Sequence, residues 1–175
     1  MNDPRYPIGK FQAPVRYDAS GRATSIDAVA AVPSALRAAL QGLTAAQLDT
    51  PYRDGGWTVR QLVHHVADSH INAFIRFKLA LTESEPTITA YDENLWARLP
   101  DVQGTPVEVS LSLVDALHAR WVVLLRAMQE AEFARAFKHP ERGLMTLDHT
   151  LAMYSWHGQH HVAHITELKK QKGWK

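Results

Sequence analysis

The segment that follows Gly56 reads Trp57-Thr58-Val59-Arg60-Gln61-Leu62-Val63-His64-His65-Val66-Ala67-Asp68-Ser69-His70. Thr58 is a residue type that commonly caps a helix N-terminus, and no proline or glycine interrupts the chain from there to Glu83. The segment therefore predicts a long helix. Apolar residues lie around most of its circumference, which is typical of a central helix in a bundle: Val59, Leu62, Val63, Val66, Ile71, Phe74 and Phe77.

One polar stripe interrupts the apolar surface of this helix. Within about 60° on either side of His65 lie Gln61, Asp68, Ser69, Asn72 and Arg76. Buried polar side chains need hydrogen-bonding partners, so such a stripe usually lines a polar cavity or contacts another polar element. His65 is the histidine of this helix that is placed to face a polar cavity, because His70 points toward the apolar side.

Three further long helices are predicted from their amphipathic periodicity. The first spans residues 25–41 with Ser25 as N-cap, and Pro33 either kinks it or separates two shorter helices. The other two span residues 110–130 and 146–171. Shorter helical pieces are predicted after Thr44, which begins a capping box, and at residues 93–98 and 131–138. Residues 139–146 are expected to form a turn or a small hairpin.

Stretches that contain several prolines and glycines flank or connect these helices. Residues 1–24 are expected to form an extended arm, and residues 84–109 form a connection long enough to cross over the bundle. Four long helices with long crossover connections predict an all-α protein, a four-helix bundle built as one domain over residues 1–175.

The composition excludes several kinds of site. The chain has no cysteine, so any transition-metal site must use histidine, aspartate or glutamate, and a cysteine nucleophile is excluded. Lys plus Arg number 19 against 18 for Asp plus Glu, without a long basic run, which argues against nucleic acid as a partner. No apolar run is long enough to cross a membrane, and the N-terminus lacks a signal-peptide pattern, so a cytoplasmic location is expected.

Four of the ten histidines lie within eight residues of the last predicted helix: His157, His160, His161 and His164. Residues four apart share a helix face, so His157 and His161 can bind one metal ion together, and they lie closest to the apolar side. His160 and His164 have the same spacing but lie toward one edge. The alternative interpretation is a polar helix edge that happens to be rich in histidine.

Facing helices of a bundle can combine their side chains into one metal site. His65 with His157 and His161 would provide three imidazoles and leave one position open, which is the ligand set of a catalytic zinc. Nitrogen ligands also suit nickel, cobalt, manganese and iron(II). Asp68 could orient a ligand or act as a base, or be a surface carboxylate. Arg76 could bind an anionic group of the substrate, or pair with an acid on a neighbouring helix.

Three blocks of the sequence resemble the YfiT group of the DinB-like superfamily: Tyr6-Pro7-Ile8-Gly9-Lys10-Phe11, residues 50–70, and residues 156–164. The resemblance runs over essentially the whole chain. It implies an up-down-down-up four-helix bundle, a homodimer, and one divalent metal per chain held by three histidines. In the superfamily pattern these ligands fall on His65, His157 and His161.

The resemblance also implies a function, with alternatives. The YfiT group is described as metal-dependent hydrolases, in which the metal activates water against a small-molecule substrate. Other members of the superfamily are transferases or isomerases that bind a low-molecular-weight thiol, such as bacillithiol, at the open metal position. A third possibility, independent of the family, is a non-catalytic binding module stabilised by the metal, with a closed fourth position.

Overall fold

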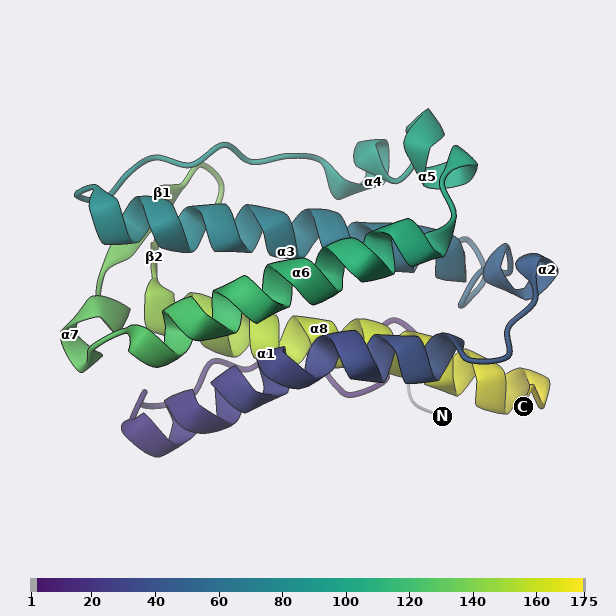
Figure 1. Ribbon diagram of the computed structural model, residues 1–175, viewed down its shortest axis with the longest axis horizontal. Helices are drawn as coiled ribbons and strands as arrows, with labels where there is room; N and C mark the ends of the chain where they lie inside the picture. Colours follow the sequence, from purple (N-terminus) through teal and green to yellow (C-terminus); the bar gives the residue numbers. More distant parts are fainter. Residues whose placement is uncertain (1–2, 175) are drawn as a thin grey trace.

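The computed structural model describes residues 3–174. Its four long helices are α1 (Ala19–Leu40), α3 (Val59–Thr82), α6 (Val107–Ala127) and α8 (Leu147–Lys172). In Figure 1, α1 and α8 run in one direction and α3 and α6 run in the other. Helices α6 and α8 each pack against both α1 and α3. The all-α, up-down-down-up four-helix bundle predicted above is confirmed.

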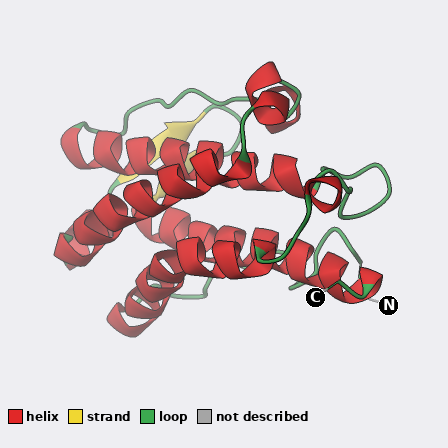
Figure 2. Ribbon diagram, turned by 45° about the vertical axis from the view of Figure 1, so that its right-hand side comes forward, coloured by secondary structure: helices red, strands yellow, loops and turns green. Residues whose placement is uncertain are grey.

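The parallel course of α3 and α6 requires a long connection between them. Residues 83–106 return along the outside of α3 and include α4 (Glu93–Trp96) and α5 (Pro100–Gly104) (Figure 1). Two other short helices are α2 (Ala45–Leu48) and α7 (Glu130–Phe133). Strands β1 (Ala136–His139) and β2 (Gly143–Thr146) form an antiparallel hairpin at one end of the bundle (Figure 2). The predicted crossover and hairpin are therefore both present.

The helix starts follow the predicted capping chemistry in most places. The Thr58 hydroxyl accepts a hydrogen bond from the Gln61 amide, and the Gln61 side chain accepts one from the Thr58 amide. Thr44 forms the same reciprocal capping box with Gln47 at α2. Thr146 caps α8 through a hydrogen bond from the His149 amide. Each cap satisfies an amide that has no partner within its helix.

The predicted start of α1 and part of the predicted region before the hairpin are wrong. Asp18, rather than Ser25, caps α1 by accepting a hydrogen bond from the Gly21 amide, so residues 19–24 are helical and do not belong to the arm. Pro33 lies inside one uninterrupted helix. The helical piece predicted at 131–138 is wrong in its second half, because residues 136–139 form strand β1. Residues 1 and 2 of the predicted arm and residue 175 lie outside the described residues.

The bundle core consists of two apolar clusters separated by a layer of histidines. The cluster toward the hairpin is built around Phe77, Trp121, Leu147 and Leu151. The other is built around Leu36, Leu62, Val63 and Ile165. Between them along the helices lie His70, His118, His157 and His161, of which His70 and His118 are almost completely inaccessible to solvent. A polar layer at this depth requires partners within the protein.

Two further features position this layer. A Cβ atom on Gly158 would lie 2.4 Å from a Val32 methyl carbon, so the glycine allows α8 to approach α1 closely. The N-terminal segment runs along α8, with the Trp156 indole donating to the Gly9 carbonyl and the Tyr17 hydroxyl bonded to His149. Among the helices of residues 3–174, none is apolar over a length that would cross a membrane.

Candidate metal centre

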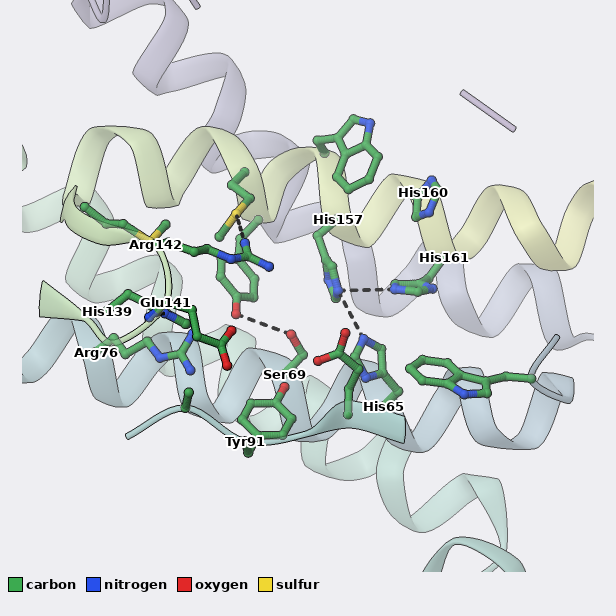
Figure 3. A pocket seen from close by; sticks show the side chains of 17 residues that line it. His65, Ser69, Arg76, Tyr91, His139, Glu141, Arg142, His157, His160 and His161 are labelled. Atoms are coloured by element: carbon green, nitrogen blue, oxygen red, sulfur yellow. Dashed lines mark hydrogen bonds between the residues drawn. The ribbon is translucent and has the colours of Figure 1, made fainter. Parts of the chain in front are cut away.

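Three imidazoles converge where α3 faces α8. The Nε2 atom of His157 lies 3.2 Å from Nε2 of His65 and 3.2 Å from Nε2 of His161. All three ligand atoms lie within 4.8 Å of one another, and no other group of this kind occurs among residues 3–174. Ligand nitrogens around a tetrahedral zinc ion lie about 3.4 Å apart, given zinc–nitrogen distances of about 2.0–2.1 Å. The donor set therefore fits a divalent metal (Figure 3).

The protein environment keeps these imidazoles neutral. Burial lowers the pKa of His65 to about 4. Burial also lowers the pKa of His157 and of His161 well below the usual histidine value, and the neighbouring imidazoles lower both further. A neutral imidazole is the form that binds a metal ion, so at neutral pH the three side chains need not lose a proton first.

A chain of hydrogen bonds extends from this cluster across the bundle. His157 Nδ1 lies 3.1 Å from Nε2 of His70, and His70 Nδ1 lies 2.8 Å from Nε2 of His118. His118 Nδ1 lies 2.8 Å from the carbonyl oxygen of Val29. We call His157, His70 and His118 the histidine chain. It joins α8, α3, α6 and α1 through the polar layer of the core.

The end of the histidine chain determines where its protons lie. The Val29 carbonyl can only accept, so His118 Nδ1 carries the proton and donates it. His118 Nε2 must then accept from His70 Nδ1, and His70 Nε2 must accept from His157 Nδ1 because each neutral ring carries one proton. This leaves His157 Nε2 with a free lone pair directed at His65 and His161. The tautomer required for metal binding is thus set by a backbone carbonyl on the far side of the core.

Pro33 explains why that carbonyl is available. In a regular helix the Val29 carbonyl would accept from the amide of residue 33, four positions later. Proline has no amide hydrogen, so this bond cannot form within α1. The His118 imidazole provides a donor in its place. The proline that seemed to interrupt the first helix instead leaves an acceptor for the histidine chain.

The second histidine pair of α8, His160 and His164, has a different environment. His160 stacks on the Trp156 ring with centroids 4.3 Å apart. His164 packs against Tyr52, and its Nε2 lies 3.3 Å from the carbonyl oxygen of Arg5. Both are buried, although the sequence placed them toward the helix edge. We call them the outer pair, because they face the N-terminal arm rather than His65.

A cavity of about 290 Å³ opens beside the three-histidine cluster. Figure 3 shows His65, His157 and His161 on one side of it and Arg76, His139 and Arg142 on the other, with Ser69 and Tyr91 between. Burial raises the pKa of Tyr91 to about 12, and burial also raises the pKa of Tyr154. These phenols keep their protons at neutral pH and can donate hydrogen bonds into the cavity. Of the polar stripe predicted around His65, Ser69 and Arg76 line this cavity, whereas Gln61, Asp68 and Asn72 do not, so the prediction is confirmed only in part.

The two other residues predicted for the site, Arg76 and Asp68, have different positions. Arg76 lines the cavity, whereas Asp68 does not. Burial, together with the charge of Asp101, raises the pKa of Asp68 to about 6, but this carboxyl group lies away from the cavity and gains no support as a base from its position. Sequence reasoning missed the roles of His70 and His118, since each lies on the apolar side of its helix and only the packing of α3 on α6 joins them.

Fold and site together define a helical bundle with a candidate three-histidine metal centre. The family model described as "DinB superfamily" matches residues 28–165, and the chain belongs to this family. It is 51% identical over 176 residues to a Bacillus cereus (strain B4264) protein named "Putative metal-dependent hydrolase", covering 99% of this chain and 100% of that protein. A Bacillus thuringiensis protein named in the same way is 50% identical over the same length.

Solved structures that are similar to this chain include YfiT and TT2238. YfiT from Bacillus subtilis, described as "a probable metal-dependent hydrolase with an unusual four-helix bundle topology", superposes with a TM-score of 0.95 at 46% identity. The match covers 98% of this chain and 99% of YfiT. TT2238, described as "a four-helix bundle protein", matches with a TM-score of 0.58 at 20% identity and supports the fold alone.

Proposed function

We propose that this protein is a metal-dependent hydrolase of small molecules, with one divalent transition metal held by His65, His157 and His161. The observation that carries the proposal is the convergence of three neutral Nε2 atoms beside a cavity. The names of the full-length relatives support it. Three imidazoles without a thiolate or carboxylate are the ligand set of catalytic zinc sites, so zinc is the metal we propose first.

The proposed reaction assigns distinct roles to the residues of the chain. A bound divalent metal would supply Lewis acidity for activating water and polarising a carbonyl group. The histidine chain keeps the proton of His157 on Nδ1, which leaves Nε2 free as a ligand. Trp57 packs on the His65 ring, with centroids 4.7 Å apart, and restricts its orientation. The protonated Tyr91 and Tyr154 can donate hydrogen bonds to a substrate oxygen in the cavity.

The first test is the metal content of protein purified without a nickel column. We expect about one transition metal per wild-type chain by elemental analysis, and loss of that metal in His65→Ala. Circular dichroism verifies that the variant remains helical. Absence of metal from the wild type even after reloading would contradict the proposal, and so would full occupancy of the His65→Ala variant.

The second measurement asks which nucleophile the site uses. Protein reloaded with zinc, nickel, cobalt or manganese is assayed against activated esters, amides and lactones, with the free metal ion and the reloaded His65→Ala variant as controls. We expect hydrolysis that requires metal and no added thiol. If cleavage is absent and the loaded protein instead accelerates conjugation of bacillithiol to an alkylating agent, the protein is a thiol transferase and the hydrolase proposal is wrong.

A further inference from the structure

Arg76 is a buried cation without a protein partner. Its side chain comes from α3, three helical turns after His65 on the same face, and only 8% of the residue is accessible to solvent. Among residues 3–174, no carboxylate lies within 4.0 Å of its guanidinium nitrogens, and no hydrogen bond to a protein acceptor is formed. A buried charge without a partner costs free energy, and an arginine side chain cannot avoid that cost by becoming neutral.

The same protein pairs another arginine of similar burial in the usual way. The Arg22 side chain, 12% exposed, donates from Nε and from an Nη atom to the two oxygens of Asp148, at 2.7 and 2.8 Å. A buried charge generally requires such a partner, since removing an ion from water costs several kcal/mol. Arg76 is placed against a cavity instead of a carboxylate. An anion that enters the cavity would provide the missing partner.

The other charged groups around Arg76 leave this position positive. Arg142 and His139 come from the hairpin, and burial lowers the pKa of His139, so this imidazole is neutral at neutral pH. Glu93 and Glu141 also line the cavity, but both are exposed to solvent. Tyr91 and Tyr154 keep their protons. The buried fixed charge in this half of the cavity is therefore the single positive charge of Arg76.

We propose that Arg76 binds a carboxylate of the substrate, and that the substrate class is small carboxylate-bearing molecules whose reactive carbonyl lies at the three-histidine cluster. Only the part of this inference that places a reactive carbonyl at the three-histidine cluster rests on the proposed function. Binding of the carboxylate at Arg76 does not depend on it. A guanidinium can bind either a carboxylate or a phosphate in a bidentate arrangement. The one positive charge of Arg76 balances a singly charged carboxylate but would leave a doubly charged phosphate with a buried, uncompensated negative charge, so a carboxylate is the better match. Arg142, at the solvent-exposed edge, adds attraction for an entering anion.

The spacing along α3 limits the length of the substrate. Arg76 follows His65 by eleven residues, or roughly 16 Å of helix, and its long side chain leans back toward the helix N-terminus. The carboxylate and the reactive carbonyl must therefore be separated by several bonds. A simple amino-acid ester would be too short, whereas a mono-ester of a linear dicarboxylic acid would span the cavity.

The binding half of the proposal can be tested without metal or catalysis. Hexanoate, hexanamide and pentyl phosphate are titrated into EDTA-treated protein by calorimetry, so that no carboxylate can coordinate a metal. We expect hexanoate to bind and to raise Tm, with at least tenfold weaker binding of the other two compounds. If hexanoate binds no better than hexanamide, the proposal is wrong. Preferential binding of pentyl phosphate would contradict the choice of carboxylate.

Two arginine variants identify the residue responsible. Arg76→Gln should weaken hexanoate binding at least tenfold. Arg76→Lys keeps the charge but loses the planar pair of N–H donors, so its affinity for hexanoate should lie between those of Arg76→Gln and the wild type. The matched control is Arg126→Gln, which removes the same charge from an exposed pair with Asp27 and should bind hexanoate like the wild type. Unchanged binding in a folded Arg76→Gln variant would overturn the assignment.

The reactive half is tested with the metal-loaded protein. Mono-4-nitrophenyl esters of dicarboxylic acids from succinate to suberate are compared with neutral esters of equal chain length. We expect kcat/KM to favour an ω-carboxylate ester at least tenfold at one chain length, and this preference to disappear in Arg76→Gln. Hexanoate binding without hydrolysis of any ester would refute the proposed function but leave the anion site standing. Hydrolysis without a carboxylate preference would refute the anion site alone.

Discussion

Helix α8 carries two histidine pairs with the same spacing and different surroundings. His157 and His161 face α3, where His65 completes a cluster of three nitrogen atoms. His160 and His164 face Trp156, Tyr52 and the Arg5 carbonyl, which belong to α8 itself, the loop before α3 and the N-terminal arm. His160, His161 and His164 are buried, and His157 is half-buried beside the cavity. Spacing therefore makes a pair able to bind metal, but the third partner across the bundle decides which pair can do so.

The inner pair, His157 and His161, also differs from the outer pair because one of its members belongs to the histidine chain. His157 Nδ1 is bonded to His70 and so belongs to a defined network. Within residues 3–174, the Nδ1 atoms of His160, His161 and His164 are all buried and have no hydrogen-bonding partner, so the histidine chain holds only one member of the inner pair, His157. A metal site gains from fixed tautomers and fixed ring orientation, because an unconstrained ring must be ordered when the metal binds. The outer pair serves as packing for the N-terminal arm.

The largest effect is expected from removing a histidine of the inner pair, in comparison with removing one of the outer pair. His161→Ala should abolish stoichiometric metal binding while leaving the fold helical, because only two of the three converging nitrogen atoms remain. His164→Ala should keep about one metal per chain and lose about 1 kcal/mol of stability, through the lost contacts with Tyr52 and the Arg5 carbonyl. Elemental analysis and thermal unfolding of both variants measure these outcomes. Full occupancy in His161→Ala with loss in His164→Ala would reverse the comparison.

A smaller effect is expected at a distance from the ligands. His118→Leu removes the acceptor for His70 and releases the tautomer of His157, so metal affinity should fall about 10–100-fold with all three ligands present. The matched control is His64→Leu, which removes a buried histidine of α3 that bonds to Ser110 on α6 and does not join the chain. Competition with a chromophoric chelator gives both affinities. Equal losses in the two variants would mean that the effect is one of core packing alone.

The helices themselves were largely readable from the sequence, because periodicity and capping residues are local signals. Thr58 and Thr146 begin their helices where their side chains can satisfy free amides. The start of α1 was missed because Ser20, Gly21 and Thr24 favour helix weakly. Asp18 caps this first turn locally, and the Arg22–Asp148 ion pair ties it to α8. A contact between residues so distant in sequence leaves no local pattern.

The residues of the candidate site also fall into those that were predictable from a single helix and those that depend on helix packing. Angular arithmetic on single helices selected His65, His157 and His161, which the structure brings together, although their binding of metal remains a prediction. It also selected Arg76, which lines the cavity. It could not find His70 and His118, whose bond depends on how α3 packs against α6. The sequence pointed to Pro33 but not to the bond between His118 and the Val29 carbonyl. A carbonyl without an amide partner in its own helix gains one only if another helix provides a donor.

The smallest effect on metal binding, and the most diagnostic, is expected from Pro33→Ala. Alanine restores an amide hydrogen opposite the Val29 carbonyl, and a proline inside a helix typically costs about 3 kcal/mol, so the variant should be more stable by about 1–3 kcal/mol. The restored amide competes with His118 for this carbonyl, which has a second lone pair and can accept both. Metal affinity should therefore fall only a few-fold. Thermal unfolding and the chelator competition measure the two changes on one protein.

A rise in stability together with a fall in metal affinity is hard to obtain from packing, since a better-packed core would improve both. This combination of changes is expected if the Val29 carbonyl sets the tautomer of His157 through His118 and His70. In the His118→Leu background the carbonyl has already lost this role, so adding Pro33→Ala should leave metal affinity unchanged while still raising stability. If Pro33→Ala lowers metal affinity equally in both backgrounds, the proline acts through the shape of α1, and the inner pair owes its advantage to His65 alone.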